Sequence, residues 1–288
     1  MIRFEGRVAL VTGAGRGIGY AYAELLARRG ACVVVHDTGA DENGTSQDSS
    51  VAKAAAERIR AQGGLVCAAS GEIDSRDGCR KLVAEAIAAF GRLDILIHNA
   101  GWVGYQKIEE LTPDFLARMT RVGVNMPLWL AQSAWPAMTA QRYGRILFTT
   151  SDRALYPEYA QAGLSAYAAA KMATVGITNV LAYEGATHGI RVNAISPVAK
   201  TRMWGVEGEP EELRPDAVAQ GAIFLVSEAC DASAWVLRAS NGQFHALRAC
   251  EAPGVDYPRD LRAVTADTPE GVASTWDRIA KVEPDTTH

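Results

Sequence analysis

The chain has 288 residues, of which 48% are hydrophobic and 22% charged. This balance is typical of a globular protein rather than a disordered one, and the length suits a single α/β domain with a large core. The formal net charge is -4 and no block of Lys or Arg occurs, so neither nucleic-acid binding nor attachment to a membrane surface is favoured.

The five cysteines lie far apart in the sequence, and no CxxC pair occurs among them. Their odd number and their apolar surroundings favour buried thiols in a reducing compartment over a disulfide framework or a zinc site. Residues 1–6 contain no apolar signal core, and no apolar run is long enough to span a bilayer. We therefore expect no metal, no membrane contact and a cytoplasmic location.

Short apolar runs alternate with longer helical patterns as far as about residue 240. The expected strands are residues 7–12, 32–36, 65–69, 93–98, 145–150, 191–196 and 235–239. The expected helices are residues 18–29, 51–61, 82–90, 113–141, 166–188 and 216–228. Alternating β and α units with right-handed crossovers predict an α/β fold, a doubly wound parallel sheet of the Rossmann type in a single domain.

The C-terminal part of the chain has a different composition. We expect the Rossmann-type domain to cover residues 1–245 and a tail to cover residues 246–288. The tail carries Pro, Gly and Asp, and only residues 274–280 show the pattern of a short amphipathic helix. We expect it to pack on the same domain or on a neighbouring subunit.

A strand, a glycine loop and a helix start follow one another at residues 8–19 (VALVTGAGRGIG). Glycines permit backbone angles closed to other residues and leave room for a pyrophosphate to approach main-chain N–H groups at a helix N-terminus. The spacing differs from the commoner GxGxxG, and glycine at such a turn can also serve packing alone. The residues expected to hold a dinucleotide here are Gly13, Arg16, Gly17, Ile18 and Gly19.

Asp37 ends the second expected strand, at the place where dinucleotide-binding folds carry an acidic residue. A carboxylate there accepts hydrogen bonds from the adenosine ribose and repels a 2′-phosphate, which favours NAD over NADP. Two alternatives stay open. Asp37 could be a turn or cap residue, and Arg16 could serve a 2′-phosphate.

Tyr167 and Lys171 stand at i and i+4, on one face of an expected helix. A nearby ammonium lowers the pKa of a phenol and makes it a usable base for the hydroxyl proton of an alcohol. Ser151 follows the fifth expected strand, at the sheet edge where ligands bind in open α/β folds, and can hold the substrate oxygen. Thr149 or Thr150 is an alternative hydroxyl donor. The order of these residues favours an oxidoreductase for alcohols and ketones.

Together the motifs resemble the short-chain dehydrogenase/reductase family over nearly the whole chain. The matched segments are residues 12–19 (TGAGRGIG), 99–101 (NAG), Ser151, 167–171 (YAAAK) and 191–197 (RVNAISP). The resemblance implies that Tyr167 is the catalytic acid/base, that Lys171 lowers its pKa and binds the nicotinamide ribose, and that Ser151 orients the substrate. It also implies further cofactor-binding residues, namely Glu72, Ile73, Asn99, Ala100, Gly101, Tyr167, Lys171, Pro197 and Val198.

Within the family the sequence is most similar to the D-3-hydroxyacyl-CoA dehydrogenase, or 17-beta-hydroxysteroid dehydrogenase type 4-like, subgroup. The segments behind this likeness are residues 34–37 (VVHD), 143–146 (YGRI), 182–185 (AYEG), 197–203 (PVAKTRM) and 276–279 (WDRI). It implies NAD(H)-dependent interconversion of a secondary alcohol and a ketone on a sizeable apolar substrate. The candidates are an alicyclic or steroid alcohol and a 3-hydroxyacyl thioester, and a homodimer or homotetramer is expected.

One departure from the family pattern concerns the proton relay. Gly123 stands where the family has an Asn that holds a relay water, and Asn125 would face about 200° away on a regular helix. Either the helix is distorted and Asn125 substitutes, or water and backbone serve the relay, which we favour. This departure motivates the alternative function, a catalytically weak cofactor-binding scaffold or regulator.

Two further departures lie at the substrate side. Residues 153–163 lengthen the connection between Ser151 and Tyr167 and are expected to form an enlarged loop at the substrate mouth. The segment 198–214 is short and acidic. It does not suit a polyanionic CoA tail unless basic residues compensate, the candidates being Arg153, Lys200 and Arg202.

Overall fold

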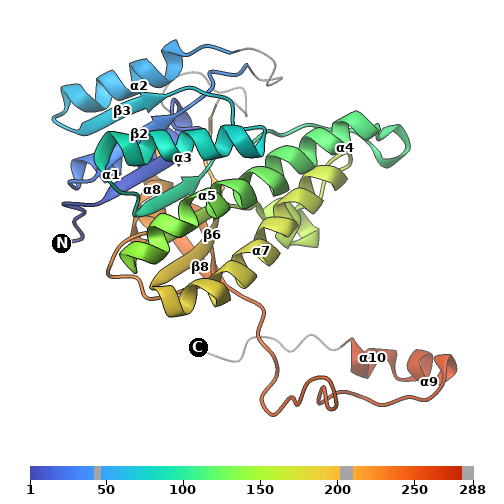
Figure 1. The fold of residues 1–288 in the computed structure, drawn as a ribbon. Helices are drawn as coiled ribbons and strands as arrows, with labels where there is room; N and C mark the ends of the chain where they lie inside the picture. Colours follow the sequence, from blue (N-terminus) through green and yellow to red (C-terminus); the bar gives the residue numbers. More distant parts are fainter. Residues whose placement is uncertain (42–46, 202–209, 281–288) are drawn as a thin grey trace. The chain divides into compact units, whose positions relative to one another are not determined.

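The computed structural model describes residues 1–41, 47–201 and 210–280. The chain divides into two compact units, Met1–Leu247 and Arg248–His288. The strands of the first unit are β1 (Val8–Thr12), β2 (Cys32–His36), β3 (Leu65–Ala69), β4 (Ile95–His98), β5 (Gly144–Thr149), β6 (Ile190–Val198), β7 (Val236–Ser240) and β8 (Gln243–Leu247). They form one sheet in the order β3-β2-β1-β4-β5-β6-β7-β8 (Figure 1). All neighbours pair in parallel except β7 and β8, so the predicted doubly wound α/β fold is confirmed.

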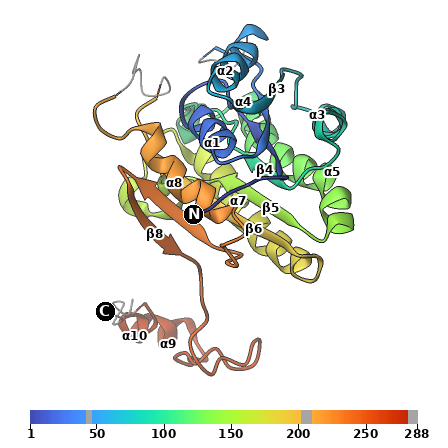
Figure 2. The same cartoon turned by 90° about the vertical axis from the view of Figure 1, so that its left-hand side faces the viewer.

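Helices cover both faces of this sheet. One face carries α1 (Gly17–Arg28), α2 (Ser50–Ala61) and α8 (Pro215–Leu225). The other carries α3 (Arg76–Phe90), α5 (Met126–Gln141) and α7 (Ser165–Gly185). Figure 2 shows α1 and α8 side by side, with α5 across the sheet. Successive β1 residues belong alternately to the two apolar clusters, as expected for a strand buried on both faces.

Several boundaries differ from the sequence prediction. Helix α3 begins at Arg76, earlier than expected, because the Ser75 side chain caps it by accepting a hydrogen bond from the Gly78 N–H. The expected helix 113–141 is divided into α4 (Pro113–Thr120) and α5 by a π-helical turn at Arg121–Asn125. Strand β8 was not predicted, and its antiparallel pairing with β7 extends the sheet beyond residue 245.

The connection between β5 and α7 contains two short elements that were not predicted, α6 (Asp152–Leu155) and a 3₁₀ turn at Pro157–Tyr159. In the second unit the structure has two short helices, α9 (Pro269–Ser274) and α10 (Trp276–Ile279). The expected tail helix at 274–280 corresponds to α10, whereas α9, which Thr268 caps, was not predicted. Among the described helices, none is both long and apolar enough to cross a membrane.

Candidate active site

A large cleft of about 1510 Å³ lies where strands β1, β2, β4, β5 and β6 reach their C-terminal ends. Single small-ligand sites usually measure about 300–1,000 Å³, so this space suits a cofactor together with a substrate. It brings together nearly all of the site residues predicted from the sequence. Those that line it are Gly13, Arg16, Gly17, Ile18, Asp37, Glu72, Ile73, Asn99, Ala100, Gly101, Ser151, Tyr167, Lys171, Pro197 and Val198.

Gly19 is the predicted residue that does not line the cleft. It is buried, and a Cβ at this position would overlap the carbonyl of Gly13. Its absent side chain therefore lets the start of α1 pack against the loop, and the contact of Gly19 with a pyrophosphate stays a prediction. Gly13 has a φ of +64°, and a Cβ there would lie 2.8 Å from the Ala100 Cα.

The start of α1 is suited to an anion. Arg16 stands at the N-cap position, and no side chain caps the first N–H groups of this 12-residue helix. Such groups, together with the helix dipole, attract a phosphate. A Cβ at Gly17, whose φ is +55°, would approach the Thr201 side chain on the cleft wall. The cradle left by these glycines fits the pyrophosphate of a dinucleotide.

Asp37 connects the glycine loop to the segment after β2. Its carboxylate accepts hydrogen bonds from the Gly15 N–H at 2.9 Å and the Gly39 N–H at 2.8 Å. Asp37 is thus a turn residue, as one alternative held, and it also lines the cleft. Glu72, further along the cleft wall, is hydrogen-bonded by the Gln47 side chain.

Ser151, Tyr167 and Lys171 converge at the other end of the cleft. Burial raises the pKa of the Tyr167 phenol, while a hydrogen bond with Ser151 and the charge of Arg153 act in the opposite direction. The expected lowering of this pKa by Lys171 is not found. The Lys171 Nζ lies 5.8 Å from the centre of the phenol ring and donates a hydrogen bond to the Thr149 carbonyl at 2.9 Å. Burial lowers the pKa of Lys171 to about 8.

The two threonines before Ser151 have structural partners. The Thr149 hydroxyl donates to the His98 carbonyl at 3.1 Å, and the Thr150 hydroxyl donates to the Lys171 carbonyl at 2.7 Å. Ser151, by contrast, lies close enough to Tyr167 to lower the pKa of its phenol, and its Oγ caps α6 by accepting a hydrogen bond from the Arg153 N–H at 3.3 Å. The enlarged mouth loop therefore leaves Ser151 within reach of Tyr167, and Ser151 remains the better candidate for the hydroxyl donor.

Sequence reasoning missed two supporting groups. The Thr12 hydroxyl accepts hydrogen bonds from the Asn99 and Ala100 N–H groups, both at 3.2 Å, and so fixes the turn after β4. The position of Thr12 directly before the glycine loop is the sequence feature that could have indicated this role. The second group joins distant segments: the Asp152 carboxylate accepts two bonds from Arg238 Nε and Nη2, and one from the Ser196 hydroxyl at 2.6 Å. No sequence pattern connects those positions.

The π-helical turn explains Gly123. A Cβ at this position would lie 2.6 Å from the Cβ of Ala170, on the helix that carries Tyr167. The glycine therefore allows the turn to approach α7 closely. The helix is distorted, as one alternative required, but Val122 and Met126 line the cleft and Asn125 does not. Asn125 consequently does not replace the family's Asn in the cleft.

Substitution Gly123→Ala is expected to lower the free energy of unfolding by about 1–3 kcal/mol, because it overpacks the contact with α7. The double variant Gly123→Ala/Ala170→Gly should recover part of this loss, since the second change removes the clashing methyl group. Urea unfolding of the two variants and of the unmodified protein measures both effects. Equal stability of Gly123→Ala and the unmodified protein would show that the turn can move away from α7.

Comparison with known proteins agrees with this geometry. The short chain dehydrogenase family profile matches residues 7–212. The chain belongs to this family. Family members bind a nicotinamide cofactor in the Rossmann-type fold. In the site described above, the glycine cradle and Asp37 are the residues that fit its adenosine and pyrophosphate part.

Particular relatives are similar over most of the chain. The mouse peroxisomal multifunctional enzyme type 2 is 35% identical over 286 residues, which cover 96% of this chain and 37% of that enzyme. The chain thus spans little more than a third of that relative. A crystal structure of a short chain dehydrogenase from Mycobacterium avium matches with a TM-score of 0.80 and 29% identity, over 98% of this chain and 97% of that one.

A second similar solved structure contains bound molecules. It is a 7 alpha-hydroxysteroid dehydrogenase complexed with NADH and 7-oxo glycochenodeoxycholic acid. It matches with a TM-score of 0.73 and 29% identity, over 83% of this chain and 95% of that chain.

Proposed function

We propose that this protein is an NAD(H)-dependent dehydrogenase or reductase that interconverts a secondary alcohol and a ketone on a sizeable apolar substrate. Candidate substrates are an alicyclic or steroid alcohol and a 3-hydroxyacyl thioester, in line with the names of the relatives. The observation that carries the proposal is the convergence of Ser151, Tyr167 and Lys171 in the cleft that also holds the glycine cradle.

The chemistry follows from the positions of these three side chains. NAD, when bound, supplies the hydride acceptor. The Ser151 hydroxyl holds the substrate oxygen, and the Tyr167 phenol oxygen takes its proton as the alcohol is oxidised and returns it in the reverse direction. Lys171 lies one helical turn after Tyr167, where its ammonium can hold a ribose hydroxyl of the cofactor. Thr150 fixes the backbone of Lys171.

A substrate screen tests the proposal. Purified protein is mixed with NAD or NADP and a panel of cyclic alcohols, steroid alcohols and 3-hydroxyacyl thioesters, and the absorbance of the reduced nicotinamide is followed. We expect turnover with NAD and at least one panel member. Tight NADH binding without turnover of any member would support the alternative, a cofactor-binding scaffold, which Gly123 motivates.

Asp37→Ala is expected to reduce the preference for NAD over NADP by at least about tenfold in kcat/KM, or ~1.4 kcal/mol, because it removes the charge that repels a 2′-phosphate. Steady-state kinetics with both cofactors measures the change. Asp114→Ala, which removes a carboxylate from the α4 side of the same cleft, is the matched control and should leave the preference unaltered. An unaltered preference in Asp37→Ala would assign the selectivity to Arg16 or another group.

The expected homodimer or homotetramer is supported by apolar side chains on the outer sides of α5 and α7. Tyr183 and Val180 are 86% and 57% exposed, and Leu128 and Met172 are also exposed. Exposed apolar side chains of this kind favour burial between copies. The cytoplasmic location remains a prediction, and five of the relatives carry the word peroxisomal in their names.

A further inference from the structure

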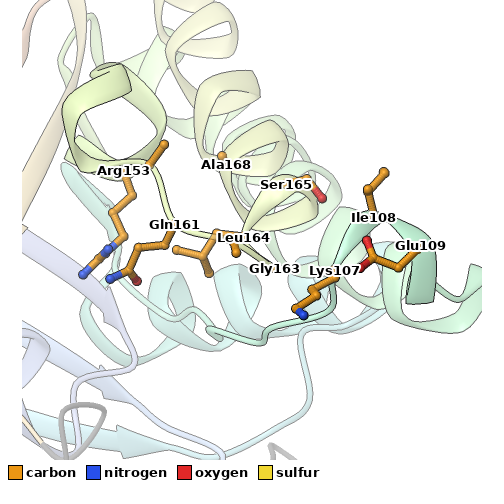
Figure 3. A pocket seen from close by; sticks show the side chains of 11 residues that line it. Lys107, Ile108, Glu109, Arg153, Gln161, Gly163, Leu164, Ser165 and Ala168 are labelled. Carbon is orange, nitrogen blue, oxygen red and sulfur yellow. The ribbon is translucent and has the colours of Figure 1, made fainter.

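A second hollow of about 450 Å³ adjoins the active-site cleft (Figure 3). Its walls are residues 107–109, 160–165 and Ala168, and most of the exposed lining is apolar. Arg153, Ala160 and Gln161 line both this hollow and the cleft. A molecule whose reacting carbon lies at Tyr167 can therefore extend past Arg153 into the hollow.

The Arg153 guanidinium has no acidic partner among the described residues. Its one side-chain hydrogen bond there is long, 3.4 Å from Nη1 to the Tyr159 carbonyl. Two other arginines that line the cleft have acidic partners: Arg238 pairs with Asp152 at 2.8 Å, and Arg121 with Asp74 at 3.8 Å. A partly buried guanidinium without a carboxylate partner is available to a ligand.

The position of Arg153 relates it to the reaction. Its charge acts on the Tyr167 phenol and opposes the rise in pKa that burial causes. Figure 3 shows the Arg153 and Gln161 side chains next to each other at one end of the hollow, with Leu164 at its centre. An anion on Arg153 would thus lie close to the catalytic groups, while the hollow offers apolar walls to the rest of the molecule.

We propose that Arg153 binds a carboxylate of the substrate and that the adjoining hollow holds an apolar part of the same molecule. The planar guanidinium matches a carboxylate through two parallel hydrogen bonds. Arg153 suits a monoanion better than the polyphosphate of a CoA tail, because the two other basic residues considered for that tail do not join it: Lys200 is paired with Glu212 at 2.5 Å and Arg202 lies outside the described residues. The substrate class is then an apolar hydroxy acid and its keto acid, an assignment that rests on the function proposed above.

The test is a binding measurement. Octanoate and methyl octanoate are titrated by calorimetry into the protein saturated with NADH, for the unmodified chain, Arg153→Gln and Arg214→Gln. We expect Arg153→Gln to weaken octanoate binding at least tenfold and to leave methyl octanoate binding unaltered. Arg214, an exposed arginine paired with Asp216 outside both spaces, is the matched control and should change neither affinity.

Equal octanoate affinity in Arg153→Gln and the unmodified chain would overturn the assignment. It would also be overturned if Arg153→Gln lost affinity for methyl octanoate as much as for octanoate. Turnover of 3-hydroxyoctanoate and its methyl ester separates this failure from that of the proposed function. If the protein oxidises neutral alcohols but its octanoate affinity does not depend on Arg153, only the carboxylate site is refuted. If octanoate binding depends on Arg153 but neither compound nor any screened alcohol is turned over, only the dehydrogenase function is refuted.

Discussion

Tyr167→Phe is expected to lower kcat by about 10³-fold, because it removes the one oxygen positioned to exchange a proton with the substrate. The affinity for NADH should stay the same, since the aromatic ring remains to fill its buried position. Single-turnover kinetics and fluorescence titration with NADH measure the two effects. Tyr143→Phe is the matched control, because Tyr143 precedes β5 at the opposite end from the cleft and contacts Arg7 and Arg145 through its ring.

The raised pKa of Tyr167 adds a pH dependence to this expectation. A phenol with a pKa above 10.0 is protonated at neutral pH and ready to donate to a ketone oxygen. Ketone reduction should therefore be insensitive to pH around neutrality, whereas alcohol oxidation should rise toward alkaline pH. If the residual alcohol oxidation by Tyr167→Phe rose toward alkaline pH in the same way, the rise would belong to another titrating group.

Lys171→Met should have two opposite effects. It should lower kcat by about 10²-fold, because the nicotinamide ribose loses the ammonium that positions it beside Tyr167. It should also raise the free energy of unfolding at neutral pH by about 1–3 kcal/mol, because burial of the ammonium is costly and the methionine removes that cost. The half-buried position of Lys171 and its hydrogen bond to Thr149 keep the gain below the value that the full pKa shift would give.

The sign of the stability effect can be followed with pH. The pKa of Lys171 falls from 10.5 to about 8 on folding, so the unfolded chain binds its proton more tightly. The destabilisation is complete below pH 8 and disappears as the pH rises toward 10.5. Thermal unfolding of the unmodified protein should therefore show a rise in stability over this interval that Lys171→Met lacks. Lys53→Met, at an exposed lysine of α2, controls for the loss of charge. A less stable Lys171→Met with the same pH profile would contradict the expectation.

The strands and the candidate catalytic residues that meet in the cleft could be predicted because their signals are local. Continuous apolar runs such as 32–36 mark buried parallel strands, and the i, i+4 spacing of Tyr167 and Lys171 holds on any regular helix. The glycine at position 19 could also be seen in the sequence, but the reason for it could not. Whether a glycine faces a ligand or a neighbouring carbonyl depends on a loop that packs from elsewhere in the fold.

Features that depend on contacts between distant segments could not be predicted. The π-helical turn at Arg121–Asn125 goes with the close approach of Gly123 to Ala170, which helix packing determines. The bond between Asp152 and Arg238 joins β7 to the mouth loop across 86 positions. The early start of α3 is different, because Ser75 is a local cap signal that the sequence contained.

Transfer of label from substrate to cofactor tests the catalytic geometry most directly. A secondary alcohol found in the screen is prepared with deuterium on the carbinol carbon, and the reduced cofactor is analysed by mass spectrometry. The unmodified protein should place the deuterium in NADH, and Tyr167→Phe should place almost none there in the same time. Equal labelling by the two proteins, or unlabelled NADH from the unmodified one, would contradict direct hydride transfer assisted by Tyr167.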